Sequence, residues 1–134
     1  MEKKSELDMV KEFHEAYNCP VHTQPIIPDM ERVNLRMKLM REELNESCFS
    51  MLEEDMVGIV DGLCDLLYVV YGTAHEFGLG QLLKEAFREV HRSNMSKLGL
   101  DGKPIYREDG KVLKGPNFTP PNLITIIQKH TDSY

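Results

Sequence analysis

The 134-residue chain lacks tryptophan and has only three cysteines, Cys19, Cys48 and Cys64. Their number is odd and their spacing includes no CxxC pair, so no disulfide framework is indicated and we expect free thiols in a reducing cytoplasm. Positive charge is also scarce: 16 Lys and Arg stand against 22 Asp and Glu, a formal charge of −6. This balance argues against a surface that binds nucleic-acid polymers.

Long apolar segments are scarce as well. The first ten residues, MEKKSELDMV, are polar and charged, so we expect no signal peptide. The longest apolar run covers residues 56–71, and its 16 residues are too few, and too interrupted by Gly and Asp, for a membrane span. The sequence therefore predicts a cytoplasmic protein that does not bind membranes, with one domain over residues 1–134.

Apolar residues recur at helical spacing in four long segments and one short segment. We expect helices that begin at Ser5, at Asp29, at Met56 (ending at Gly78) and at Leu82 (ending near Lys97), and a short last helix over residues 123–127. Three prolines favour an extended strap between the first two helices. The polar stretch 47–55 predicts the next connection, and residues 99–122 predict turns, with a short hairpin at 108–110.

These elements predict an all-α fold, a four-to-five-helix bundle with a turn-rich C-terminal tail. The helical core is expected over about residues 5–98, and the tail with its short helix over about 99–134.

Two carboxylates, Asp61 and Asp65, interrupt the apolar run. They lie four residues apart and so share one face of a helix. We expect that helix to be largely buried, and an unpaired buried carboxylate is costly. The pair therefore predicts a neutralising partner.

A second acidic group, Glu42, Glu43 and Glu46 in EELNE, offers more negative charge. Alone it would fit a solvated acidic face, but antiparallel packing would bring it against Asp61 and Asp65. Oxygen-only ligands favour Mg²⁺, with Mn²⁺ as an alternative. A di-iron bundle is excluded because no histidine has Glu or Asp three residues before it.

Magnesium sites of this kind commonly recruit substrate phosphates. The segment 97–114 carries five basic residues against three acidic ones in an otherwise acidic chain. It could contact phosphate, although a solvated tail with ordinary lysines is an equally simple interpretation.

Four segments follow one another in a characteristic order: EELNE, the helix VDGLCDLLYVVYG, the segment FREVHRSNMSK and the tail DGK…LKGP. Together they resemble the MazG-like all-α nucleoside triphosphate pyrophosphohydrolases, whose pattern is EExxE followed by ExxD. The resemblance covers about residues 9–127 and is closest to the dimeric dUTPase-related branch.

The resemblance implies metal ligands and contacts to the substrate. Glu42, Glu43 and Glu46 match EExxE and Asp65 matches the aspartate of ExxD, but Gly62 stands where that pattern has glutamate. Asp61 is the obvious substitute, and Glu42 or Glu43 would act as general base. Implied substrate contacts are Asn94, Lys97, Lys111 and Lys114, and a base pocket could use Phe13, Tyr68 or Asn94, although aromatic residues on helices more often belong to the core.

The implied reaction is Mg²⁺-dependent hydrolysis of a nucleoside triphosphate between its α- and β-phosphates, releasing pyrophosphate. The resemblance to the dUTPase-related branch also implies a preference for dUTP or dCTP and a role in clearing nucleotide pools. Two alternatives stay open: a non-catalytic nucleotide- or metal-binding module, which Gly62 favours, and a phosphoribosyl-ATP pyrophosphohydrolase relative. Because the third helix is apolar on nearly every side, we also expect a homodimer that shares it.

Overall fold

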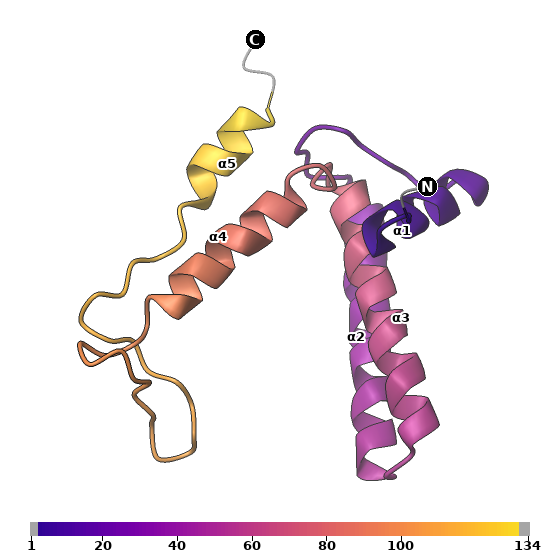
Figure 1. Ribbon diagram of the computed structural model, residues 1–134. Coiled ribbons are helices and arrows are strands. Elements are labelled where there is room, and N and C mark those ends of the chain that lie inside the picture. The colour runs from indigo at the N-terminus through magenta and orange to yellow at the C-terminus, as the bar shows by residue number, and fades with distance from the viewer. Residues whose placement is uncertain (1–2, 132–134) are drawn as a thin grey trace. The chain divides into compact units, whose positions relative to one another are not determined.

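The computed structural model describes residues 3–131, and within that range it contains five α-helices and no regular strand (Figure 1). The helices are α1 (Glu6–Ala16), α2 (Met30–Leu52), α3 (Met56–Glu76), α4 (Leu83–Met95) and α5 (Leu123–Lys129). The predicted all-α class is confirmed. The chain divides into two compact units, Met1–Gln81 and Leu82–Tyr134.

Three of the helices begin at the acidic or hydroxyl residues that cap them. Ser5, Asp29 and Asp55 each accept a hydrogen bond, 3.1 Å long, from the backbone N–H three residues ahead. Each such bond satisfies one of the N–H groups that a helix start leaves without an intrahelical partner. The predicted starts of the first three helices are therefore confirmed.

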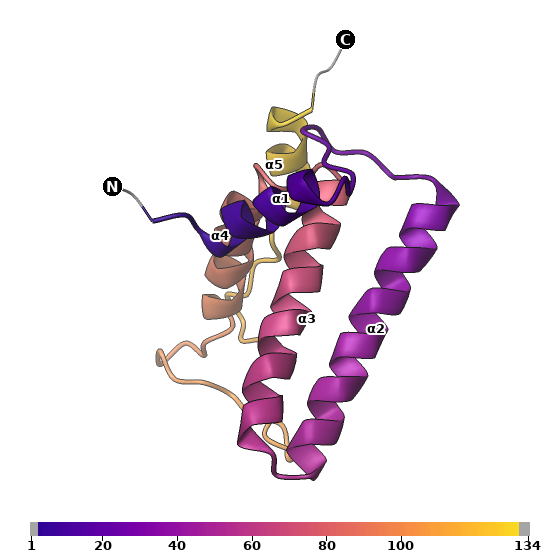
Figure 2. The ribbon, with the colours of Figure 1, turned by 90° about the vertical axis from the view of Figure 1, so that its right-hand side faces the viewer.

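In the first unit, α2 and α3 form an antiparallel hairpin (Figure 2). The prediction of a polar connection over residues 47–55 was wrong, because α2 continues to Leu52 and only residues 53–55 connect the helices. Ser47 is polar but only 1 % exposed, and it packs on α3. A small polar residue on a packing face resembles a loop residue when composition alone is considered.

The two helices come very close where Ser47 faces Gly62. A Cβ atom on residue 62 would lie 2.7 Å from Ser47 Oγ and 3.1 Å from Ser47 Cα. Gly62 is itself buried. Only glycine therefore permits this separation of the helices at residue 62.

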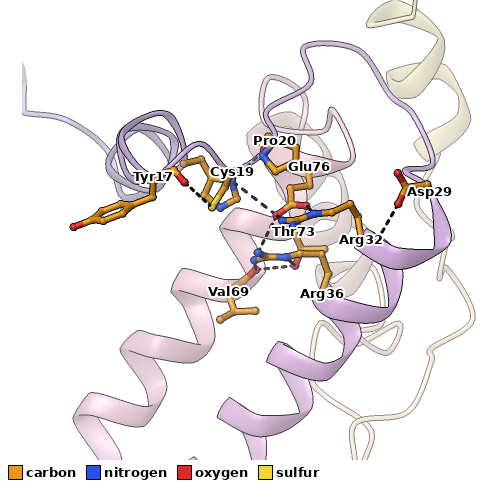
Figure 3. A network of polar contacts seen from close by, with 10 residues as sticks. Tyr17, Cys19, Pro20, Asp29, Arg32, Arg36, Val69, Thr73 and Glu76 are labelled. Carbon is orange, nitrogen blue, oxygen red and sulfur yellow. Dashed lines mark hydrogen bonds and ion pairs between the residues drawn. The ribbon is translucent and has the colours of Figure 1, made fainter.

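At the other end of the hairpin, a buried ion network joins α2 to the last residue of α3 (Figure 3). Glu76 is 0 % exposed and accepts two hydrogen bonds from Arg32, at 2.8 and 2.9 Å, and one from Arg36, at 2.9 Å. Arg36 also donates to Thr73 Oγ1 and to the carbonyl of Val69. Removing one partner of a buried ion pair typically costs about 3–5 kcal/mol, so this network fixes the register of the hairpin.

The predicted strap between α1 and α2 runs over the end of α3. The backbone N–H of His22 donates to the carbonyl of His75, and that of Ile26 to the carbonyl of Phe77, each at 2.9 Å. Gly78 follows α3 with φ of +70°, as expected for a C-terminal glycine. A Cβ at Gly78 would lie 1.7 Å from the carbonyl oxygen of Gln24, so the strap requires this glycine.

The expectation that residues 56–71 form a largely buried helix was wrong for this unit. Val57 is 81 % exposed, Val60 56 % and Leu67 52 %, because only α1 and α2 pack on α3 within the unit. By length and composition alone α3 could cross a membrane. Its two carboxylates and the ion network at its end fit a helix that packs on protein.

The second unit contains α4, the turn-rich tail and α5. Tyr106 and Val112 form an isolated antiparallel bridge, and Gly110 lies in the turn with φ of +89°. The predicted hairpin and the short last helix are thus confirmed. Arg92 of α4 anchors the tail by donating to Thr119 Oγ1 and to the carbonyl of Pro120.

Candidate functional site

The site centres on Glu43, on the side of α2 that faces α3. Its Oε2 atom is buried and accepts no hydrogen bond from any described residue. The pKa of Glu43 is raised above its ordinary value of 4.5, firstly by burial and then by the charges of Glu46, Asp65 and Asp61. We call these four residues the acidic cluster. Glu43 of one acidic group and Asp65 of the other line the same pocket.

The members of the acidic cluster differ in exposure. Asp65 is half-buried, whereas Glu46 and Asp61 are exposed. The expectation that both aspartates are shielded from water was therefore wrong for Asp61. The position on α3 that faces Ser47 is taken by the next residue, Gly62, which is buried where Asp61 is exposed. Glu42 is also exposed.

The acidic cluster fits a hard divalent cation. A buried carboxylate oxygen without a donor, surrounded by three more carboxylates, is a concentration of negative charge that a cation would relieve. All the donors are carboxylate oxygens, which suit Mg²⁺ or Mn²⁺. Among residues 3–131, no three His, Cys, Asp or Glu side chains are close enough together to coordinate one metal ion as they stand. The side chains would therefore have to draw together around the ion.

A pocket of about 360 Å³ opens beside Glu43 and Asp65. Phe13 and Tyr68 line it with their rings edge to face, 5.5 Å apart at an interplanar angle of 89°. Leu35, Leu39 and Val69 add an apolar wall. The pocket therefore joins an acidic end to an aromatic surface of the kind on which a nucleobase can stack.

The far side of the pocket carries Arg32, Arg36 and His14. Both arginines are already bound to Glu76. Burial lowers the pKa of His14 below 6.5, opposed by its hydrogen bond to the Pro20 carbonyl, so this side chain is neutral at pH 7. With a carbonyl as acceptor, His14 Nδ1 is the donor at 3.0 Å.

The sequence did not predict Arg32, Arg36, His14 or Glu76 as part of this region. One signal was available: Glu76 ends the 21-residue segment of α3, which has only two other carboxylates, and Arg32 and Arg36 are four apart on the neighbouring helix. That spacing puts both guanidinium groups on one face.

The predicted phosphate- and base-contacting residues Asn94, Lys97, Lys111 and Lys114 all lie in the second unit. Asn94 and Lys97 line a pocket of about 380 Å³ there, with Val112 and Pro104 opposite. Lys114 Nζ lies 4.8 Å from the centre of the Phe118 ring, and Lys111 is exposed. These residues are thus gathered on α4 and the tail.

A family model described as phosphoribosyl-ATP pyrophosphohydrolase matches residues 10–94, which include both acidic groups and the whole α2–α3 hairpin. The chain belongs to this family. It is a family of pyrophosphohydrolases, the enzyme class that the sequence predicts, within the MazG-like all-α superfamily.

Two relatives support this family assignment. A crystal structure from Exiguobacterium sp. 255-15, of a protein provisionally assigned as an NTP pyrophosphohydrolase, is 28 % identical and covers 96 % of each chain, with a TM-score of 0.50. An uncharacterized protein of Acanthamoeba polyphaga mimivirus is 35 % identical over 139 residues. That match covers 99 % of this chain but 52 % of the viral protein, so the chain spans about half the length of this relative.

Glu43→Gln should raise the melting temperature of the metal-free protein at pH 7 by about 2–4 °C. The raised pKa of Glu43 means that its ionised carboxylate is less stable in the folded than in the unfolded chain. This penalty is fully present above the folded-state pKa and disappears as the pH falls through it towards 4.5. The gain should therefore shrink over the same interval in thermal unfolding with EDTA.

The matched control is Glu31→Gln, on an exposed glutamate of the same helix. It should not raise the melting temperature, because a carboxylate in the first turn of a helix is favourable there. A Glu43→Gln protein that melts at or below the wild-type temperature at pH 7 would contradict this view of the acidic cluster.

Proposed function

We propose that the protein hydrolyses a nucleoside or deoxynucleoside triphosphate between its α- and β-phosphates, giving the monophosphate and pyrophosphate. One observation carries the proposal: the unpaired Oε2 of Glu43 stands among three further carboxylates, at the acidic end of an aromatic-lined pocket. Family membership supports the reaction class. A role in clearing nucleotide pools follows from the resemblance to the dUTPase-related branch.

In this proposal Glu43, Glu46 and Asp65 hold Mg²⁺, with Asp61 joining them and Mn²⁺ as a substitute. When bound, the ion neutralises phosphate charge and acts as a Lewis acid. Glu43 or Glu42 takes a proton from the attacking water. The water oxygen bonds to the α-phosphorus, the bond from that phosphorus to the bridging oxygen breaks, and pyrophosphate leaves.

The substrate contacts are proposed on the same basis. Phe13 and Tyr68 line the pocket beside Asp65, so they can take the base. The resemblance to the dUTPase-related branch also implies contacts to the nucleotide and its phosphates from Asn94, Lys97, Lys111 and Lys114. A preference for dUTP or dCTP is proposed from the resemblance to the dUTPase-related branch. We further propose a cytoplasmic protein that binds neither membranes nor nucleic-acid polymers.

Phosphoribosyl-ATP is the second candidate substrate, because the matching family model bears that name. Its hydrolysis breaks the same kind of bond and would use the same acidic cluster. The tail and the NMSK segment, which resemble the dUTPase-related branch, make it the less favoured of the two.

We also propose a homodimer formed through α3. Four apolar side chains on this helix, Val57, Val60, Leu63 and Leu67, are 44–81 % exposed, and α1 and α2 leave them uncovered in their own unit. Exposed apolar area of this extent on one helix favours association. A second copy would present the same surface and could bury both.

The enzymatic proposal predicts pyrophosphate release from at least one member of a panel that contains the NTPs, the dNTPs including dUTP, and phosphoribosyl-ATP. Release should require Mg²⁺ or Mn²⁺. Glu43→Gln should lower kcat by roughly 10²–10⁴-fold, as expected when a general base or metal ligand is lost, while Glu31→Gln should leave kcat unchanged. Nucleotide binding that depends on Mg²⁺ without any pyrophosphate release would instead indicate a non-catalytic module.

The dimer proposal predicts a single species of about 31 kDa, twice the 15.4 kDa chain, in sedimentation velocity at micromolar concentration. Leu67→Glu should shift this species towards the monomer, because it places a charge on the exposed face. A wild-type protein that sediments as a monomer would overturn the proposal.

A further inference from the structure

We propose that Gly62 is a positioning residue of the acidic cluster. Its contact with Ser47 sets the separation between the carboxylates of α2 and those of α3, so a glutamate at residue 62 would dismantle the cluster. The resemblance to the ExxD pattern alone leads to the opposite expectation, that this glutamate would complete the site. The inference rests on the proposed function, since it concerns the same metal-binding carboxylates.

The contact leaves no space for any side chain on residue 62. A Cβ there would lie 2.7 Å from Ser47 Oγ, 3.1 Å from Ser47 Cα and 3.3 Å from Ser47 Cβ. The Cα atom belongs to the backbone of α2 and cannot rotate away. A larger residue must therefore push α2 and α3 apart, or turn one helix against the other.

Ser47 is firmly held on its own side of the contact. It is 1 % exposed, and its hydroxyl donates a 2.8 Å hydrogen bond to the carbonyl oxygen of Glu43. Ser47 also follows Glu46 directly in the chain. A displacement of Ser47 is thus transmitted to Glu43 and Glu46, the two glutamates of the acidic cluster.

Gly62 has the same relation to the aspartates of α3. It follows Asp61 and lies three residues, about 4.5 Å of helix rise, before Asp65. The whole acidic cluster therefore lies within about one helical turn of the Gly62–Ser47 contact. Glu43 and Asp65 line the same pocket, so the two carboxylates lie on either side of this part of the interface.

The same geometry explains how the chain can lack the glutamate of the ExxD pattern. A side chain on residue 62 would meet α2 at Ser47, where a carboxylate would be enclosed between the helices. Asp61 lies at the exposed edge beside it and still acts on Glu43. The carboxylate is thus supplied from the adjacent position, and the inward position is left to glycine.

Gly58 offers a matched control one turn earlier on α3. A Cβ at Gly58 would lie 2.6 Å from Ser50 Oγ and 2.5 Å from Asp55 Oδ2, so it is as tightly enclosed as Gly62. The atoms that it would meet belong to the side chains of Ser50 and of the cap residue Asp55, and none belongs to the backbone of α2. No residue of the acidic cluster is adjacent to Gly58 in sequence.

The test measures Mn²⁺ affinity from the electron paramagnetic resonance signal of free Mn²⁺, without nucleotide, on proteins that circular dichroism shows to be folded. Relative to wild type, Gly62→Ala should bind Mn²⁺ about tenfold more weakly, the usual size of a change outside the ligands themselves. Gly62→Glu should bind at least tenfold more weakly despite its additional carboxylate. Gly58→Ala should stay within about threefold of wild type.

A second pair of variants covers the case in which the Gly62 variants do not fold. Ser47→Ala removes the hydroxyl at 2.7 Å but leaves the atoms at 3.1 and 3.3 Å. The double variant S47A/G62A should therefore bind Mn²⁺ more weakly than S47A, by about threefold or more. Equal affinities of S47A and S47A/G62A would overturn the inference.

The outcomes separate this inference from the proposed function. Wild-type protein that fails to bind Mn²⁺, or binds it equally well after Glu43→Gln, would overturn the proposed metal site itself. Wild-type binding that Gly62→Ala leaves unchanged, or that Gly62→Glu strengthens, would overturn only the role of Gly62.

Discussion

The packing of α2 against α3 is the constraint on which the rest of the first unit depends. One end of the hairpin is fixed by the buried pairing of Glu76 with Arg32 and Arg36, and the other by the close approach of Gly62 to Ser47. Between these two points the helices cannot slide or rotate freely. Glu43, Glu46 and Asp65 lie in this restrained stretch and Asp61 adjoins Gly62, so the fold sets the positions of the backbone segments that carry the acidic cluster.

Two glutamates of this hairpin, Glu76 and Glu43, have opposite electrostatic surroundings. Glu76 is fully buried and is compensated by two guanidinium groups, as a structural carboxylate must be. Glu43 has a buried oxygen without a donor and three carboxylates for neighbours. Because the two arginines pair with Glu76, the buried Glu43 oxygen is left without a compensating partner among the described residues, as the proposed cation site requires.

Local chemistry made the starts of the helices predictable, because Ser5, Asp29 and Asp55 carry the cap signals in the sequence itself. It also identified the acidic groups, since carboxylates in an apolar run are conspicuous. The rotation of α3 was not predictable, and it decides that Gly62 faces inward and Asp61 outward. The pairing of Glu76 with Arg32 and Arg36 depends on how α2 is aligned along α3. The exposure of α3 depends on how many helices cover it. Neither can be obtained from the spacing of apolar residues.

The most direct test of this account is a crystal of the protein grown with Mn²⁺ and measured at the manganese absorption edge. The account predicts an anomalous peak about 2.0–2.3 Å from carboxylate oxygens of both Glu43 and Asp65, with helices α2 and α3 still in contact at Gly62 and Ser47. A cation bound by Glu46 or Asp61 alone on the surface, with Glu43 Oε2 still without a partner, would contradict it.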